Sequence, residues 1–67
     1  MEVLTVKDLS KLVKQKRLEF GMTQSEASAL CNVGIRFLSE LENGKPTLQI
    51  DKVLKVVNFF GIKLFAE

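Results

Sequence analysis

Hydrophobic residues recur along this chain at the three- and four-residue spacing of α-helices, and each of its four glycines interrupts the pattern. The uninterrupted stretches predict four helices: one over about 6–20, a short one beginning after Thr23, one over about 35–43 and one over about 48–60. Three of the glycines suit the position just after a helix end, because a residue without Cβ enters the left-handed region at little cost: Gly21, Gly44 and Gly61.

Each predicted helix has an apolar side that can face a core. In the first three helices, the residues expected to point inward are Leu9, Leu12, Val13, Phe20, Ala27, Leu30, Cys31, Leu38 and Leu41. In the last helix, the expected inward stripe is Ile50, Val53, Leu54, Val57 and Phe60. This stripe leaves Val56 and Phe59 on a second, uncovered face.

The second and third helices are separated only by the turn Asn32-Val33-Gly34. Thr23 is expected to cap the second helix, because Glu26 follows three residues later in the position of a capping box, and Thr5 is expected to cap the first helix in the same way. Two short helices around a tight turn, over residues 23–43, form a helix-turn-helix that can lay its second helix in the major groove of DNA.

The chain has 67 residues, which is enough for one domain, and we expect residues 1–67 to form it. A core of this size is marginal alone, so dimerisation would stabilise it. The net charge is only +2, from ten Lys and Arg against eight Asp and Glu, which is weak support for nucleic-acid binding. What matters is whether the positive groups share one face.

Several classes of chemistry are disfavoured by what the sequence lacks. One cysteine and no histidine exclude an intrachain disulfide and a typical zinc site, and we expect no metal or cofactor. Cys31 is expected to be a buried, inert thiol, since no histidine can serve as its base. Without a catalytic grouping or a glycine-rich phosphate loop, an enzyme is disfavoured. No apolar run approaches the ~20 residues of a membrane span, so a cytoplasmic protein is expected.

The first turn of the third helix offers the side chains that would read bases. Arg36 can donate both arms of its guanidinium to guanine O6 and N7. Ile35 is placed to contact a thymine methyl, and Ser39 can reach a base or a phosphate. Glu40 could accept from cytosine N4 or could orient Arg36, four residues earlier. For an isolated helix these residues would be a solvated surface, but the surrounding motif favours DNA contact.

A second group of residues is placed to hold the DNA backbone. Gln24 begins the second helix, where its amide and the free backbone N–H groups can bind a phosphate. Thr23 could add a hydroxyl, although capping is favoured. Asn43 and Lys45 flank Gly44 after the third helix and can reach the neighbouring strand; the alternative for Lys45 is an exposed loop lysine.

The tail over about 62–66 is rich in strand-favouring residues and follows the apolar face left by the last helix. A single strand cannot satisfy its own backbone groups, so we expect it to pair with the same strand of a second copy around a two-fold axis. The expected dimer interface consists of Val56, Phe59, Ile62, Leu64 and Phe65. The alternative is a frayed tail.

Taken together, four helices, Thr-Gln-x-Glu at 23–26 and Leu-Glu-Asn-Gly-Lys at 41–45 resemble the phage repressor/Cro-like (XRE) helix-turn-helix family over residues 7–60. The run Arg36 to Thr47 and the strand-like tail are most similar to the HipB-type antitoxins of toxin–antitoxin operons. The chain departs from this family at Gly34, where a serine is common, so it lacks a hydroxyl cap on the third helix.

The resemblance implies an all-α fold of four or five helices with a short C-terminal strand. It implies that Arg17 and Glu42 form a partly buried ion pair between the first and third helices, with a DNA role for Arg17 as the lesser alternative. It also implies phosphate contacts at Gln24, Asn43 and Lys45.

The function that the resemblance implies is a dimeric repressor that binds an inverted-repeat operator in double-stranded DNA and acts as an antitoxin. Its partner would then be a HipA-like kinase toxin. Two alternatives stay open, namely a stand-alone phage-type regulator and a helical protein-interaction module that does not bind DNA.

Overall fold

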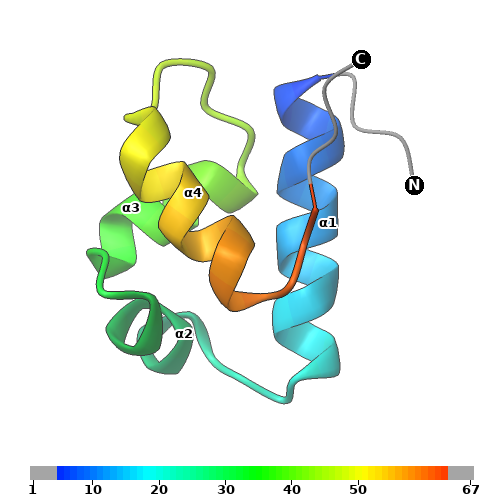
Figure 1. Cartoon of the computed structure of the whole chain (residues 1–67), viewed down its shortest axis with the longest axis vertical. Helices are drawn as coiled ribbons and strands as arrows, with labels where there is room; N and C mark the ends of the chain where they lie inside the picture. The colour runs from blue at the N-terminus through cyan, green and yellow to red at the C-terminus, as the bar shows by residue number, and fades with distance from the viewer. Residues whose placement is uncertain (1–4, 64–67) are drawn as a thin grey trace.

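The computed structural model describes residues 5–63, and these form four helices. They are α1 (Val6–Glu19), α2 (Gln24–Cys31), α3 (Ile35–Glu42) and α4 (Ile50–Phe59). α1 stands along one side of the molecule, α2 lies across the end at which α1 finishes, and α3 and α4 pack between them (Figure 1). The expected four-helix, all-α architecture is confirmed, and no helix among the described residues has the length and hydropathy needed to cross a membrane.

The helix ends follow the local signals in the sequence. Thr5 accepts a hydrogen bond from the backbone N–H of Asp8 at 3.2 Å. Thr23 and Glu26 form a complete capping box, in which the Glu26 N–H donates to Thr23 Oγ1 at 3.1 Å and the Thr23 N–H donates to Glu26 Oε1 at 3.0 Å. The three glycines expected after helix ends all have positive φ. Each of these helix ends is determined by residues that lie close to it in the sequence, which is why the sequence predicts the ends.

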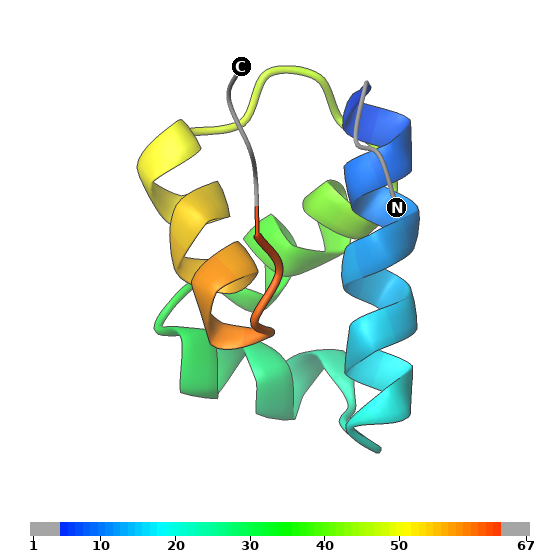
Figure 2. The same ribbon diagram turned by 45° about the vertical axis from the view of Figure 1, so that its right-hand side comes forward.

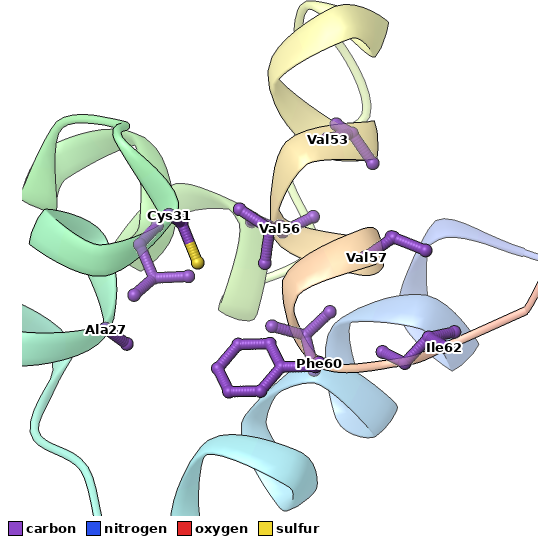
Figure 3. Packing of buried hydrophobic residues seen from close by; sticks show 10 residues of the cluster. Ala27, Cys31, Val53, Val56, Val57, Phe60 and Ile62 are labelled. Carbon is purple, nitrogen blue, oxygen red and sulfur yellow. The ribbon is translucent and has the colours of Figure 1, made fainter.

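The core gathers where the four helices meet. Its largest fully buried side chains are Leu38, Leu41, Val13, Val56 and Val57. Figure 3 shows α4 presenting Val56 toward Cys31 of α2, while Val57 lies on the side of the segment that carries Ile62. Burial raises the pKa of the Cys31 thiol, as expected for an inert core cysteine.

The predicted inward face of α4 is partly wrong. Ile50 is 66% exposed and Leu54 is 41% exposed, whereas Val56 is fully buried. The buried stripe is instead Val53, Val56, Val57 and Phe60. This stripe also has helical spacing, and α4 adopts it because α2 contacts one flank of the helix and the chain after α4 folds back to cover the other (Figure 3).

Two further residues that were predicted to face the core, Leu30 and Phe20, are exposed. Leu30 is exposed on α2, because Ala27, Ser28 and Cys31 form the buried side of that helix. Phe20 is half exposed, yet its ring contacts Phe60 edge-on, with 5.2 Å between the ring centroids.

The expected dimer interface also needs correction. Val56 and Ile62 are buried within the single chain, so they are core residues and cannot form an uncovered face. Phe59 is partly buried, with its ring centroid 5.0 Å from that of Phe60. Within the expected strand, Ile62 and Lys63 have irregular backbone, and Leu64 and Phe65 lie outside the described residues.

Candidate nucleic-acid interface

α2 and α3 are joined by a three-residue turn with defined backbone geometry. Asn32 takes the left-handed conformation, with φ 58°, and its N–H donates to the Ala29 carbonyl at 3.2 Å. Gly34 is extended, with φ −69° and ψ 149°, and its carbonyl accepts the first hydrogen bond of α3 from the Leu38 N–H. The chain turns back after α2, so that α3 lies above α2 and packs against it (Figure 2). This is the arrangement of a helix-turn-helix.

The N-terminal turn of α3 is exposed. Leu38 and Leu41 anchor the helix in the core, while Ile35 is 52% exposed and Arg36 is exposed beside it. Ser39 is partly buried one turn later. Because the apolar side of α3 faces the core, the exposed residues of its first turn are accessible to an external partner. Base readout requires such access.

Gly34 gives no side-chain hydrogen bond to the start of α3, as its sequence position predicts. A Cβ built there meets no atom within 4 Å, and φ is negative. We expect Gly34→Ser to raise the free energy of unfolding by about 0.5–1 kcal/mol, through a new cap and a less flexible unfolded chain. Thermal unfolding should show a midpoint about 3–6 °C higher.

Gly21→Ser is the matched control for this substitution. Its Cβ also meets open space, but its φ is +70°, so the same side chain should destabilise the protein by about 1 kcal/mol. A midpoint that moves equally in both variants would contradict the capping argument.

Glu40 and Lys45 form an ion pair where α3 ends. Lys45 Nζ donates to Glu40 Oε2 at 2.7 Å, and both side chains remain partly exposed. The hydrogen bond from Lys45 lowers the pKa of the Glu40 carboxyl, and the charge of Arg36 adds a smaller effect in the same direction. Three of the predicted DNA-contacting residues therefore lie within one electrostatic cluster.

Arg17 and Glu42 form the second ion pair, and it is buried. Arg17 donates from Nε to Glu42 Oε2 at 2.7 Å and from Nη2 to Glu42 Oε1 at 3.0 Å. Its Nη1 donates to the Met22 carbonyl at 2.8 Å. These hydrogen bonds to Glu42 raise the pKa of Arg17 above its ordinary value. The pair joins α1 to α3 and holds the loop that leads into α2.

Gln24 belongs to the same network. Its Nε2 donates to Glu42 Oε1 at 3.2 Å, so the amide at the start of α2 is tied to the buried carboxylate. Thr23 uses its hydroxyl oxygen and its N–H in the capping box, and Asn43 is exposed as the residue that ends α3. Gln24 therefore lies beside the C-terminal end of α3, and Asn43 and Lys45 follow that same end along the chain.

The sequence pattern missed two contacts that join different helices of this region. One is the Gln24–Glu42 hydrogen bond, which joins residues 18 positions apart. The other is Lys52 on α4, whose Nζ lies 5.9 Å from the ring centroid of Phe37. Neither contact has a local signal, because each depends on how two helices pack.

Comparison with known proteins agrees with this geometry. A family model described as helix-turn-helix matches residues 13–65. The chain belongs to the helix-turn-helix family. A curated relative, the uncharacterized HTH-type transcriptional regulator y4mF of Sinorhizobium fredii (strain NBRC 101917 / NGR234), is 40% identical over 62 residues, which span 92% of this chain and 82% of the relative. The chain itself is therefore a DNA-binding transcriptional regulator of the helix-turn-helix family.

Solved structures share its fold. The protein in the HipB-O4 20mer complex superimposes with a TM-score of 0.86 at 18% identity, over 98% of this chain and 93% of that chain. The chain in the HipA-HipB-O2-O3 complex gives the same values. The restriction-modification controller protein C.Esp1396I is 27% identical, with a TM-score of 0.75, over 94% of this chain and 80% of that chain. The resemblance to HipB therefore extends to the whole fold.

Proposed function

We propose that the chain is a sequence-specific repressor that binds an inverted-repeat operator as a homodimer, with residues 1–67 as one DNA-binding domain. The observation that carries this proposal is the exposed first turn of α3, which begins with Ile35 and Arg36. Leu38 and Leu41 anchor the helix in the core. A helix presented in this way enters the major groove with its N-terminal residues against the base edges. Arg36 then reads guanine, and Ile35 and Ser39 contact neighbouring positions.

Backbone contacts come from two segments beside α3. Thr23 and Gln24 approach one strand from the start of α2, where helix N–H groups and the helix dipole attract a phosphate. Asn43 and Lys45 approach the backbone from the loop after α3. Phosphate contacts from two separate segments fix the depth and angle of the recognition helix, so that base contacts become selective.

The two-fold dimer is supported by the small size of the core and by the apolar C-terminal residues. Phe59, Leu64 and Phe65 are the proposed contacts, with residues 62–66 pairing as strands. A dimer places two copies of α3 about one DNA turn apart, which matches an inverted repeat. Light scattering should then give twice the chain mass of 7.5 kDa, and a monomer at micromolar concentration would contradict it.

The finer role that we propose is that of an antitoxin. The fold likeness to HipB over 98% of the chain supports it, as does the HipB-like run from Arg36 to Thr47. The partner would be a HipA-like kinase toxin, which the neighbouring reading frame would encode. Co-expression of that neighbour should give a stable complex and relieve the toxicity of the neighbour expressed alone.

A controller without a toxin partner is the second candidate. The 27% identity to a restriction-modification controller protein favours it. Under this alternative the chain still represses an operon, but no kinase-like neighbour copurifies with it.

The first test of base reading is Arg36→Ala. We expect it to weaken binding to a duplex selected by the wild-type protein by about 10- to 100-fold, because a bidentate arginine–guanine contact discriminates by ~1–3 kcal/mol. Binding to a scrambled duplex should weaken much less. Fluorescence anisotropy with both duplexes measures the difference.

Lys14→Ala is the control, since it removes one exposed positive charge from α1. It should reduce both affinities slightly and equally. If Arg36→Ala also reduced them equally, Arg36 would be a backbone contact and not a base-reading residue.

Salt dependence tests the phosphate contacts. Each neutralised phosphate should contribute ~0.9 to the slope of log K against log salt concentration. Lys45 is the one cationic side chain among these four contacts, so its two copies predict a slope of about −2 for the dimer. Titrations over a range of salt concentrations measure this slope, and a slope near zero would exclude the whole proposed interface.

A further inference from the structure

The ion pair between Glu40 and Lys45 occupies an unusual place for an acidic group. It lies where α3 ends, next to a surface that should attract a polyanion. The Glu40 side chain is 29% exposed and the Lys45 side chain is 46% exposed, so both can reach an incoming partner. Arg36, one helical turn before Glu40, carries a second positive charge on the same side of α3.

The Glu40 carboxylate and a DNA phosphate can bind the Lys45 ammonium group in the same way. Both groups offer oxygen atoms that accept a charge-assisted hydrogen bond from an ammonium group. The 2.7 Å contact already satisfies one N–H of Lys45 before any DNA arrives. A DNA phosphate must therefore compete with Glu40 for Lys45, and the displaced carboxylate then faces a dense array of negative charge.

We propose that Glu40 sets the affinity of the interface for DNA by holding Lys45 in this internal ion pair, and that it does not read a base. The inference rests on the proposed contact between α3 and DNA. Because the competition involves only phosphate, it weakens binding to every duplex by a similar factor. The protein thereby dissociates faster from any site than its cations alone would allow.

The test uses Glu40→Gln in the full chain, with two fluorescent duplexes. One duplex is selected from a random library by the wild-type protein, and the other is a scrambled version of it. We expect about fivefold tighter binding to both duplexes, because Lys45 is released to contact a phosphate. If Glu40 accepts a hydrogen bond from a cytosine, binding to the selected duplex weakens instead, and the inference is wrong.

A double-mutant cycle asks whether the effect passes through Lys45. Lys45→Met should weaken binding to both duplexes. In that background, Glu40→Gln should change the affinity less than twofold, since no lysine remains to be released. A full fivefold gain without Lys45 would show that Glu40 acts by general charge alone, which overturns the inference.

Glu19→Gln is the matched control. It removes the same charge from the last residue of α1, at the end of the molecule opposite the α3–α4 segment (Figure 1). It should change affinity less than twofold, and a gain equal to that of Glu40→Gln would overturn the inference. Circular dichroism of each variant establishes that the fold is kept.

The two possible failures are distinguishable. If the wild-type protein binds neither duplex, the proposed DNA-binding role of α3 fails, and the inference fails with it. If the wild-type protein binds and Glu40→Gln behaves like Glu19→Gln, only the role of Glu40 fails.

Discussion

Replacing Glu42 with alanine should lower the free energy of unfolding by about 3–5 kcal/mol. The Glu42 side chain is only 2% exposed, and its two oxygens accept hydrogen bonds from Arg17 and Gln24. Without it, the Arg17 guanidinium stays buried among α1, α3 and the loop before α2 with most of its partners removed. A domain of this size is stabilised by about 5 kcal/mol, so the variant should be largely unfolded near 37 °C. Urea denaturation followed by circular dichroism measures the loss.

Two companion variants separate the buried charge from other causes. Glu40→Ala removes a carboxylate from the same helix, but its exposed ion pair should leave the urea midpoint nearly unchanged. The double variant Arg17→Met, Glu42→Leu replaces the pair with apolar groups and should recover most of the stability lost by Glu42→Ala. If Glu42→Ala were no worse than Glu40→Ala, the Arg17–Glu42 pair would not stabilise the fold.

The local features of this fold could be predicted because their causes are local. The capping box at Thr23 and Glu26 depends on four consecutive residues, and the glycine that follows α3 depends on one. Leu38 and Leu41 could be assigned inward because α3 has only one apolar side. The helix-turn-helix follows from these signals together.

The features that the sequence did not reveal depend on packing between helices. α4 carries apolar residues on more than one side, so its pattern fits two different inward stripes. Only the positions of α2 and of the chain after Phe60 decide between them. The Lys45–Glu40 pair likewise depends on the path of the loop that leaves α3, and five-residue spacing is not a helical contact distance.

The same contrast between local causes and packing between helices applies to the residues of the candidate interface. Arg36 could be proposed from its place at the start of a helix, which the sequence fixes to within a residue or two. The role of Glu42 came from resemblance, and its hydrogen bond to Gln24 required the packed structure. A residue can therefore be assigned to a helix tip from pattern alone, whereas its partners across helices cannot.

Val56→Asp tests which face of α4 is buried in the core. It should lower the free energy of unfolding more than any other substitution on that helix. Val56 is fully buried between α4 and α2, so the new carboxylate would have neither water nor a hydrogen-bond donor. We expect a loss of about 4 kcal/mol or more, which removes most helical circular dichroism at 25 °C. If Val56 instead faced a second copy, the variant would be a folded monomer with normal helix content.

Ile50→Asp is the control for this substitution, because it places the same side chain on the same helix at a residue that is 66% exposed. It should stay folded, and an acidic group in the first turn of a helix is favourable to the helix dipole. Val56→Ala gives a measurable intermediate case, with an expected loss of about 2–3 kcal/mol from removed burial and the cavity left behind. An unfolded Val56→Asp beside a folded Ile50→Asp would establish that α4 turns Val56 into the core and Ile50 outward.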